Sequence, residues 1–319
     1  MLFSPVPMHI PDGFLSVGVA VVLWLIAIGV VGYALKRVNA DVGERQVPLM
    51  GVLAACIFAG QMLNFPVTGG TSGHLMGAAI ATILIGPWAA ILVMTCVVGV
   101  QALIFQDGGL LALGANIVNM GVIGVTVAYF VQRTLRKFLG NKSGGLFASG
   151  FLSGWLSIVA AALACALQLA LSGSSPANIA IPAMAGIHAL IGVGEGLITA
   201  GALVFIKAAR RDLLEAERTQ VVGGKAVWIG GLVIAVALAI ISPRASTHPD
   251  GLEWVAEQRG FLDLAQGPLF EIIPDYVLPG VANESLATIL AGVIGALIVF
   301  GAAAGVAYLR RSRAQSSGA

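Results

Sequence analysis

The chain has 319 residues, of which 58% are hydrophobic and only 10% are charged, and its formal net charge is +2 with histidine counted as neutral. Soluble domains carry about 25% charged residues, so this composition excludes a soluble protein. A nearly neutral chain without a basic face also excludes nucleic acid as a partner. We therefore predict an all-α protein that crosses the membrane several times and contacts lipid.

Long apolar runs predict the membrane spans in chain order. The run 74–105 is too long for one span, and Pro87 near its middle would end a helix, so we interpret it as two helices that meet at Gly86–Pro87. This division gives nine spans, at 16–35, 47–65, two within 74–105, 110–131, 145–171, 183–206, 226–241 and 286–309.

The basic residues predict how the spans are oriented. Nine spans place all but Arg244 and Arg259 of the 17 lysines and arginines on one side. Because cytoplasmic loops are enriched in lysine and arginine, the N-terminus is expected outside and the C-terminus in the cytoplasm. All four histidines then lie near the outer face, together with an acidic loop, 242–284. That loop either concentrates cations or is simply solvated, and both interpretations stay open.

The chain divides into three parts. We predict a seven-span unit at 8–206, a polar cytoplasmic linker at 207–225 and a two-span unit at 226–311. A phosphate-binding loop is missing, because Gly224-Lys225 is followed by Ala226. Uphill transport would therefore need ATP hydrolysis by a partner. Cys56, Cys96 and Cys165 lie in apolar runs and are interpreted as reduced packing residues.

A metal chelate is predicted at the start of the seven-span unit. If the mature chain begins at Met8, its amine, the amide nitrogen of His9 and the Nδ1 atom of His9 form fused five- and six-membered chelate rings. Such a planar set of strong nitrogen donors suits Ni²⁺ or Cu²⁺. His74 follows a glycine-rich segment on the same face and could supply a fourth nitrogen. The alternative is a histidine that caps a helix at the interface.

Four motifs carry a family resemblance. MHIPDGFLS (8–16), GTSGHLMG (70–77), GANIVNMG (114–121) and MAGIHALIGVGEGLIT (184–199) resemble the NikM/CbiM family, the nickel/cobalt substrate-capture (S) components of energy-coupling-factor transporters. PDGLE at 249–253 resembles the accessory NikN component, here fused. The resemblance implies a seven-helix S-component bundle in the cell membrane, no catalysis and no prosthetic group. Its cargo would be Ni²⁺ or Co²⁺ in a square-planar site formed by Met8, His9 and His74.

The resemblance also implies partners, namely a transmembrane coupling (T) subunit and ATP-binding cassette ATPases. The chain departs from the family because it starts seven residues before Met8. Three explanations are open: translation starts at Met8, the extension is removed, or the metal site differs. We favour a start at Met8. Other polar residues could orient the ligands as a second shell or tie helices together: Asp12, Asn116, Asn119, His188 and Glu195. His248 either shuttles metal or is an ordinary loop residue.

The sequence thus predicts the substrate-binding membrane subunit of an ATP-driven nickel or cobalt importer, in which the two-span tail helps to load or open the site. A self-sufficient divalent-cation channel or secondary carrier is the alternative within transport. A metal-dependent membrane hydrolase would need Asp12 or Glu195 as its general base, and neither lies in a helical metal-ligand motif.

Overall fold

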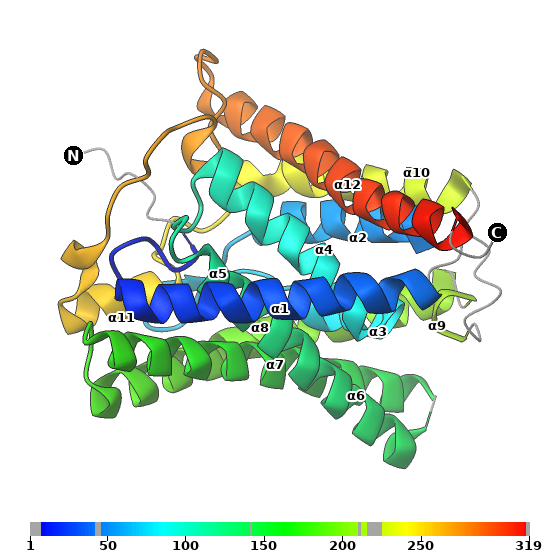
Figure 1. Ribbon diagram of the computed structural model, residues 1–319, viewed down its shortest axis with the longest axis horizontal. Coiled ribbons are helices and arrows are strands. Elements are labelled where there is room, and N and C mark those ends of the chain that lie inside the picture. Colours follow the sequence, from blue (N-terminus) through cyan, green and yellow to red (C-terminus); the bar gives the residue numbers. More distant parts are fainter. Residues whose placement is uncertain (1–7, 42–45, 141, 210–211, 216–224, 317–319) are drawn as a thin grey trace.

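The computed structural model describes residues 8–41, 46–140, 142–209, 212–215 and 225–316 (Figure 1). Most helices run roughly along the long axis of the molecule, and among the described residues seven are long and apolar enough to cross a membrane. The predicted all-α membrane fold is confirmed. These helices are α1 (Val17–Asp41), α4 (Pro87–Val100) continued by η1 (Gln101–Phe105), α5 (Leu113–Asn116) continued by η2 (Ile117–Gly124) and α6 (Val125–Leu139), α7 (Ser143–Ser172), α8 (Ala177–Ala209), α10 (Lys225–Ile241) and α12 (Glu284–Ser316).

Two shorter segments also run along the bundle. The first is α2 (Gln46–Gln61), which is followed by an antiparallel hairpin of β1 (Phe65–Val67) and β2 (Thr71–Gly73). The second is α3 (Ala78–Ile85), whose eight residues span only about 12 Å of a hydrocarbon core of about 30 Å. The chain between β2 and α3, residues 74–77, is not helical.

The segment from β2 to α3 nevertheless extends from one end of the bundle to the other. At one end β2 contacts α11 (Gly251–Arg259). At the other end Ile85 joins an apolar cluster with Leu213 of α9 (Asp212–Glu215). The membrane crossing predicted here is therefore partly extended and partly helical.

The structure corrects several predicted span boundaries. The chain does break at Gly86, where φ is 79°, and Pro87 begins α4. However, the predicted span 47–65 ends too late, because Pro66 and the positive-φ Gly69 and Gly70 favour a hairpin. The helix predicted at 110–131 begins at Leu113 and continues to Leu139.

The tail helices α10 and α12 pack directly on α2. Glycines allow this close approach, since a β-carbon at Gly51 would lie 2.9 Å from the Phe300 ring and one at Gly295 would lie 2.2 Å from the Phe58 ring. In addition, the Cys56 thiol donates a hydrogen bond to the carbonyl oxygen of Gly231, at 3.3 Å. The tail is therefore part of the bundle.

The acidic loop 242–283 is folded and covers one end of the bundle. It contains η3 (Ser242–Arg244), α11, η4 (Leu262–Leu264) and η5 (Pro274–Tyr276). Leu252, Phe261 and Tyr276 are among its buried side chains. Backbone hydrogen bonds tie it to the seven-span unit, from Ser72 to Pro249, from Gln266 to Asp12 and from Ile273 to Ile104. The loop thus forms a lid over this end of the bundle.

Candidate metal-binding site

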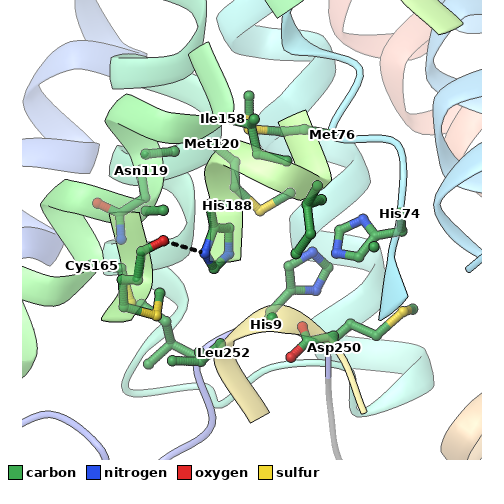
Figure 2. Close-up of a pocket in the computed structure, with 18 of the residues that line it drawn as sticks. His9, His74, Met76, Asn119, Met120, Ile158, Cys165, His188, Asp250 and Leu252 are labelled. Atoms are coloured by element: carbon green, nitrogen blue, oxygen red, sulfur yellow. Dashed lines mark hydrogen bonds between the residues drawn. The ribbon is translucent and has the colours of Figure 1, made fainter. Parts of the chain in front are cut away.

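A cavity of about 90 Å³ lies beneath this lid, and we call it the histidine cavity. Its lining includes His9, His74 and His188 and the methionines Met76, Met120 and Met184 (Figure 2). Pockets for organic ligands usually measure about 300–1,000 Å³. The histidine cavity is far smaller, and its size suits an ion with few waters.

His9 presents two nitrogens to a single carboxylate oxygen. Its backbone N–H donates a hydrogen bond to Oδ1 of Asp107, at 3.2 Å, and its Nδ1 atom lies 3.0 Å from the same oxygen. Gly108, with φ at 93°, permits this approach, because a β-carbon there would lie 2.9 Å from the β-carbon of His9. The two His9 nitrogens of the predicted chelate therefore converge on one point.

The charges of His9 and Asp107 stabilise each other in the protein interior. Burial alone would lower the pKa of the His9 imidazole, but the Asp107 carboxylate beside it raises that pKa above its usual value. Burial alone would raise the pKa of Asp107, yet His9 and a hydrogen bond from Tyr276 hold it below its usual value. The buried carboxylate of Asp107, beneath the lid, thus keeps its negative charge beside the histidine cavity.

His74 and His188 both present one ring nitrogen to the cavity. The ring centroids of His9 and His74 are 5.8 Å apart and the rings are at 75° to each other. The Nδ1 atom of His74 lies 3.1 Å from the carbonyl oxygen of Leu75, and that of His188 lies 2.9 Å from the carbonyl oxygen of Met184. A nitrogen at this distance from a carbonyl carries the proton, so Nε2 of each ring keeps its lone pair.

Asp12 and Asn116 hold the N-terminal segment in place. The carboxylate of Asp12 accepts hydrogen bonds from the backbone N–H groups of Leu110 and Ala112, at 3.1 and 3.0 Å. The Asn116 side chain accepts from the N–H of Ile10 and donates to its carbonyl oxygen, both at 3.1 Å. These contacts fix the backbone next to His9.

Glu195 performs the same role for the His74 segment. Its carboxylate accepts hydrogen bonds from the backbone N–H groups of Met76, at 2.7 Å, and Gly77, at 3.1 Å. These groups precede α3 and have no partner within a helix. Asn119 instead forms two hydrogen bonds with Gln168 of α7, at 2.8 and 2.6 Å, and this pair ties η2 to α7.

Sequence reasoning missed Asp107 and the position of Asp250. A carboxylate followed by two glycines at the end of a span is an available signal for Asp107, although its contact with His9 joins residues 98 positions apart. Asp250 begins α11, where Oδ1 accepts a hydrogen bond from the Glu253 N–H at 2.7 Å. Burial raises the pKa of Asp250 to about 8.

A second and wider cavity of about 870 Å³ adjoins the first, and we call it the acidic cavity. Met8 and Asp250 line both cavities. His248 also lines the acidic cavity and not the histidine cavity. The carboxylates of the acidic cavity come from Asp107, Asp250, Glu253, Glu257, Glu271, Asp275 and Glu284.

Side chains alone do not form a complete metal site. Within the part of the chain that the structure describes, no group of three or more His, Cys, Asp or Glu side chains is arranged to hold a metal ion. The predicted chelate differs from such a group, because the Met8 amine and the His9 amide nitrogen are main-chain donors.

Comparison with known proteins identifies the class. Residues 9–213 match the family CbiM, described as a cobalt uptake substrate-specific transmembrane region, and residues 225–312 match the PDGLE domain. The chain therefore belongs to the CbiM family of nickel/cobalt transport proteins and carries a PDGLE domain. This result confirms the predicted resemblance and a multi-pass membrane protein of a transport family.

Particular relatives resemble the chain over nearly its full length. A NikMN-type relative from Archaeoglobus fulgidus is 39% identical over 310 residues, which cover 96% of this chain and 99% of the relative. The fused nickel transport protein NikMN of Rhodobacter capsulatus is 30% identical, with 92% and 96% covered. The crystal structure of a truncated transition metal transporter is 35% identical with a TM-score of 0.57, and the match covers 63% of this chain and 99% of that one.

Proposed function

We propose that this chain is the substrate-binding membrane subunit of an ATP-driven importer for nickel or cobalt ions. The ion binds in the histidine cavity at the external face and is released inside when partner ATPases act through a transmembrane coupling subunit. Met8 supplies its amine, His9 its amide nitrogen and Nδ1, and His74 its Nε2. The chain itself contributes selectivity and binding, and the partners contribute the energy.

The convergence of the two His9 nitrogens carries this proposal. Both face a single point at 3.0–3.2 Å, and the His74 ring stands beside them. Met8 lines the same cavity, so a free amine at this residue would complete the set. Few divalent metals can displace an amide proton, and a planar array of strong nitrogen donors suits those that do, Ni²⁺ among them.

The supporting residues argue against the hydrolase alternative. Asp12 and Glu195, the two carboxylates considered as general bases, each accept two backbone hydrogen bonds. These contacts occupy the oxygens of both carboxylates and shape the backbone around His9 and His74. In the proposed importer Asp12, Asn116, Asn119, His188 and Glu195 support the ligands and are not themselves the primary metal ligands.

The ligand assignment is tested by single substitutions. We expect His9→Ala and His74→Ala to weaken Ni²⁺ binding to the purified full chain by more than about 100-fold, above the 10–100-fold typical of supporting residues. His248→Ala is the matched control, because this histidine lies outside the histidine cavity, and it should bind within about twofold of the wild type. Equal binding by His9→Ala and the wild type would overturn the site.

The amine ligand requires a separate measurement. The intact mass of the protein purified from membranes should correspond to a chain that begins at Met8; residues 1–7 lie outside the described residues. A chain that keeps residues 1–7 would lack the amine, and the proposed site would then need another fourth donor.

Coupling to ATP is tested by uptake. Cells that contain this chain with its T subunit and ATPases should accumulate Ni²⁺, and an inactivating substitution in the ATPase should abolish the accumulation. Accumulation by this chain alone would favour the channel or secondary carrier.

A further inference from the structure

Asp107 occupies the position that a bound metal would take against His9. Metal–imidazole bonds are about 2.0–2.1 Å long. An oxygen that lies 3.0 Å from Nδ1 and 3.2 Å from the amide nitrogen therefore leaves no room for an ion bonded to both atoms. If the chelate forms, this carboxylate has to withdraw.

A tail residue holds Asp107 from the opposite side. The Tyr276 hydroxyl donates a hydrogen bond to Oδ2 of Asp107, at 2.5 Å, and accepts one from Nε2 of Gln101, at 3.0 Å. The Tyr276 ring stacks on Phe105 with centroids 4.8 Å apart and 16° between the planes. Asp107, Gln101 and Tyr276 are all buried. The Asp107 carboxylate thus connects the tail to His9, because Oδ2 contacts Tyr276 and Oδ1 contacts the two His9 nitrogens.

The backbone at this contact is strained. Asp275 and Tyr276 both have positive φ, at 53° and 57°, and neither is a glycine. Residues other than glycine disfavour positive φ, and such backbone conformations persist where the surrounding contacts hold them. The hydrogen bonds and the ring stacking of Tyr276 provide this restraint. A contact maintained against local strain can act as a latch that opens when its partners separate.

The acidic cavity provides room for the withdrawal. Asp107 and Tyr276 both line it, together with Met8. A carboxylate that turns away from His9 would therefore enter a wide space and would not have to move into packed side chains. The same space leads to Met8, whose amine is one of the proposed ligands.

We propose that Asp107 is a placeholder for the metal, which holds the two His9 nitrogens in the metal-free protein, and that Tyr276 of the tail latches it there. This inference rests on the proposed metal site. Metal enters when Asp107 withdraws, so the Tyr276 hydroxyl controls the rate of binding. Tyr276 is a positioning residue in this scheme, since it acts on the metal only through Asp107.

The test compares the rate of Ni²⁺ binding in matched variants of the purified full chain. Tyr276→Phe removes the hydroxyl and keeps the ring and the charge, and we expect Ni²⁺ to associate about tenfold faster, as followed by stopped-flow absorption. Tyr308→Phe makes the same chemical change at an exposed position of the tail and should match the wild type. An unchanged or slower rate for Tyr276→Phe would overturn the latch.

A double-mutant comparison separates the latch from a general structural effect. In an Asp107→Ala background, where the latch has nothing to hold, Tyr276→Phe should leave the association rate unchanged. A tenfold effect that persists without Asp107 would contradict the proposal.

His9→Ala distinguishes this failure from a failure of the metal site. If His9→Ala abolishes Ni²⁺ binding while Tyr276→Phe behaves like Tyr308→Phe, the site stands and the latch is wrong. If His9→Ala binds Ni²⁺ normally, both proposals are wrong.

Discussion

The histidine cavity and the acidic cavity share two lining residues and differ in almost every other property. The first measures about 90 Å³ and offers imidazole nitrogens and thioether sulfurs among apolar side chains. The second measures about 870 Å³ and offers carboxylates. Carboxylates attract any cation, whereas nitrogen donors discriminate in favour of transition metals. We infer that, in the proposed importer, the acidic cavity attracts cations and the adjacent histidine cavity selects among them.

Among substitutions that test the difference between the two cavities, we expect the largest effect on stability and Ni²⁺ affinity at Glu195. Replacing it with alanine leaves the buried N–H groups of Met76 and Gly77 without an acceptor, at a cost of about 1–3 kcal/mol for each group. We expect the free energy of unfolding to fall by about 3 kcal/mol and Ni²⁺ affinity to drop more than tenfold, because the segment that carries His74 loses its support. Glu195→Gln keeps one acceptor and should lose about half as much stability.

Thermal unfolding in detergent and Ni²⁺ titration measure these two effects. Asp263→Ala, at an exposed position of the lid, is the control and should alter neither quantity. Full stability of Glu195→Ala would show that this carboxylate does not support the histidine cavity.

A smaller effect is expected where the lid closes on the histidine cavity. A β-carbon at Gly251 would lie 2.6 Å from Cδ1 of Ile191 and 2.9 Å from Cε1 of His188. Gly251→Ala should therefore push the lid away at a cost of about 1–3 kcal/mol. We expect Ni²⁺ to bind about tenfold more weakly. Gly267→Ala is the control, because a β-carbon there meets no atom within 4 Å, and it should change neither stability nor Ni²⁺ affinity. Equal Ni²⁺ affinities for the two variants would show that the position of the lid does not affect the metal site.

The smallest effect is expected in the acidic cavity. Replacing Glu253 and Glu257 with glutamine removes two carboxylates that line it but leaves the histidine cavity unchanged. We expect Ni²⁺ to associate about threefold more slowly at low salt, with the same dissociation rate, because these charges act at long range. The difference should shrink when the ionic strength is raised above about 0.1 M, where the screening length is about 10 Å.

Asp263→Asn is the matched control for this pair, because Asp263 does not line the acidic cavity. A change in the dissociation rate of the Glu253 and Glu257 variant would place these carboxylates in the binding site itself and end the division of roles between the two cavities.

The features that could be predicted from the sequence are those determined by residues close together in the chain. Apolar runs identified the helical membrane architecture, and Gly86–Pro87 marked a break because glycine readily adopts the positive φ found there and proline cannot continue the preceding helix. His9 was singled out since the atoms of one dipeptide can form a chelate. His74 was placed near it by topology and by resemblance, and the structure brings the two rings within 5.8 Å.

Contacts between distant segments could not be predicted. Asp107 meets His9 across 98 positions, and it meets Tyr276 across 169, a contact that requires the tail to fold over the bundle. The extended stretch at 74–77 is apolar enough to resemble helix, and side chains from other segments satisfy its backbone: Glu195 accepts from the N–H groups of Met76 and Gly77, and Gln61 donates to the carbonyl oxygen of Met76. Hydropathy cannot distinguish such a segment from a continuous span.

The packing of α10 and α12 on α2 has a consequence for the history of the chain. The seven-span unit and the two-span tail already fit each other through glycine and phenylalanine residues on α2 and α12. The covalent connection therefore keeps the two units close together but does not create the complementary surfaces. Some relatives match only the first module, such as the cobalt transport protein CbiM of Sorangium cellulosum, which is 36% identical over 67% of this chain and 97% of its own length. A two-span module made as a separate chain would meet the same glycine and phenylalanine faces of α2, so the covalent connection is expected to raise its local concentration and not to create the interface.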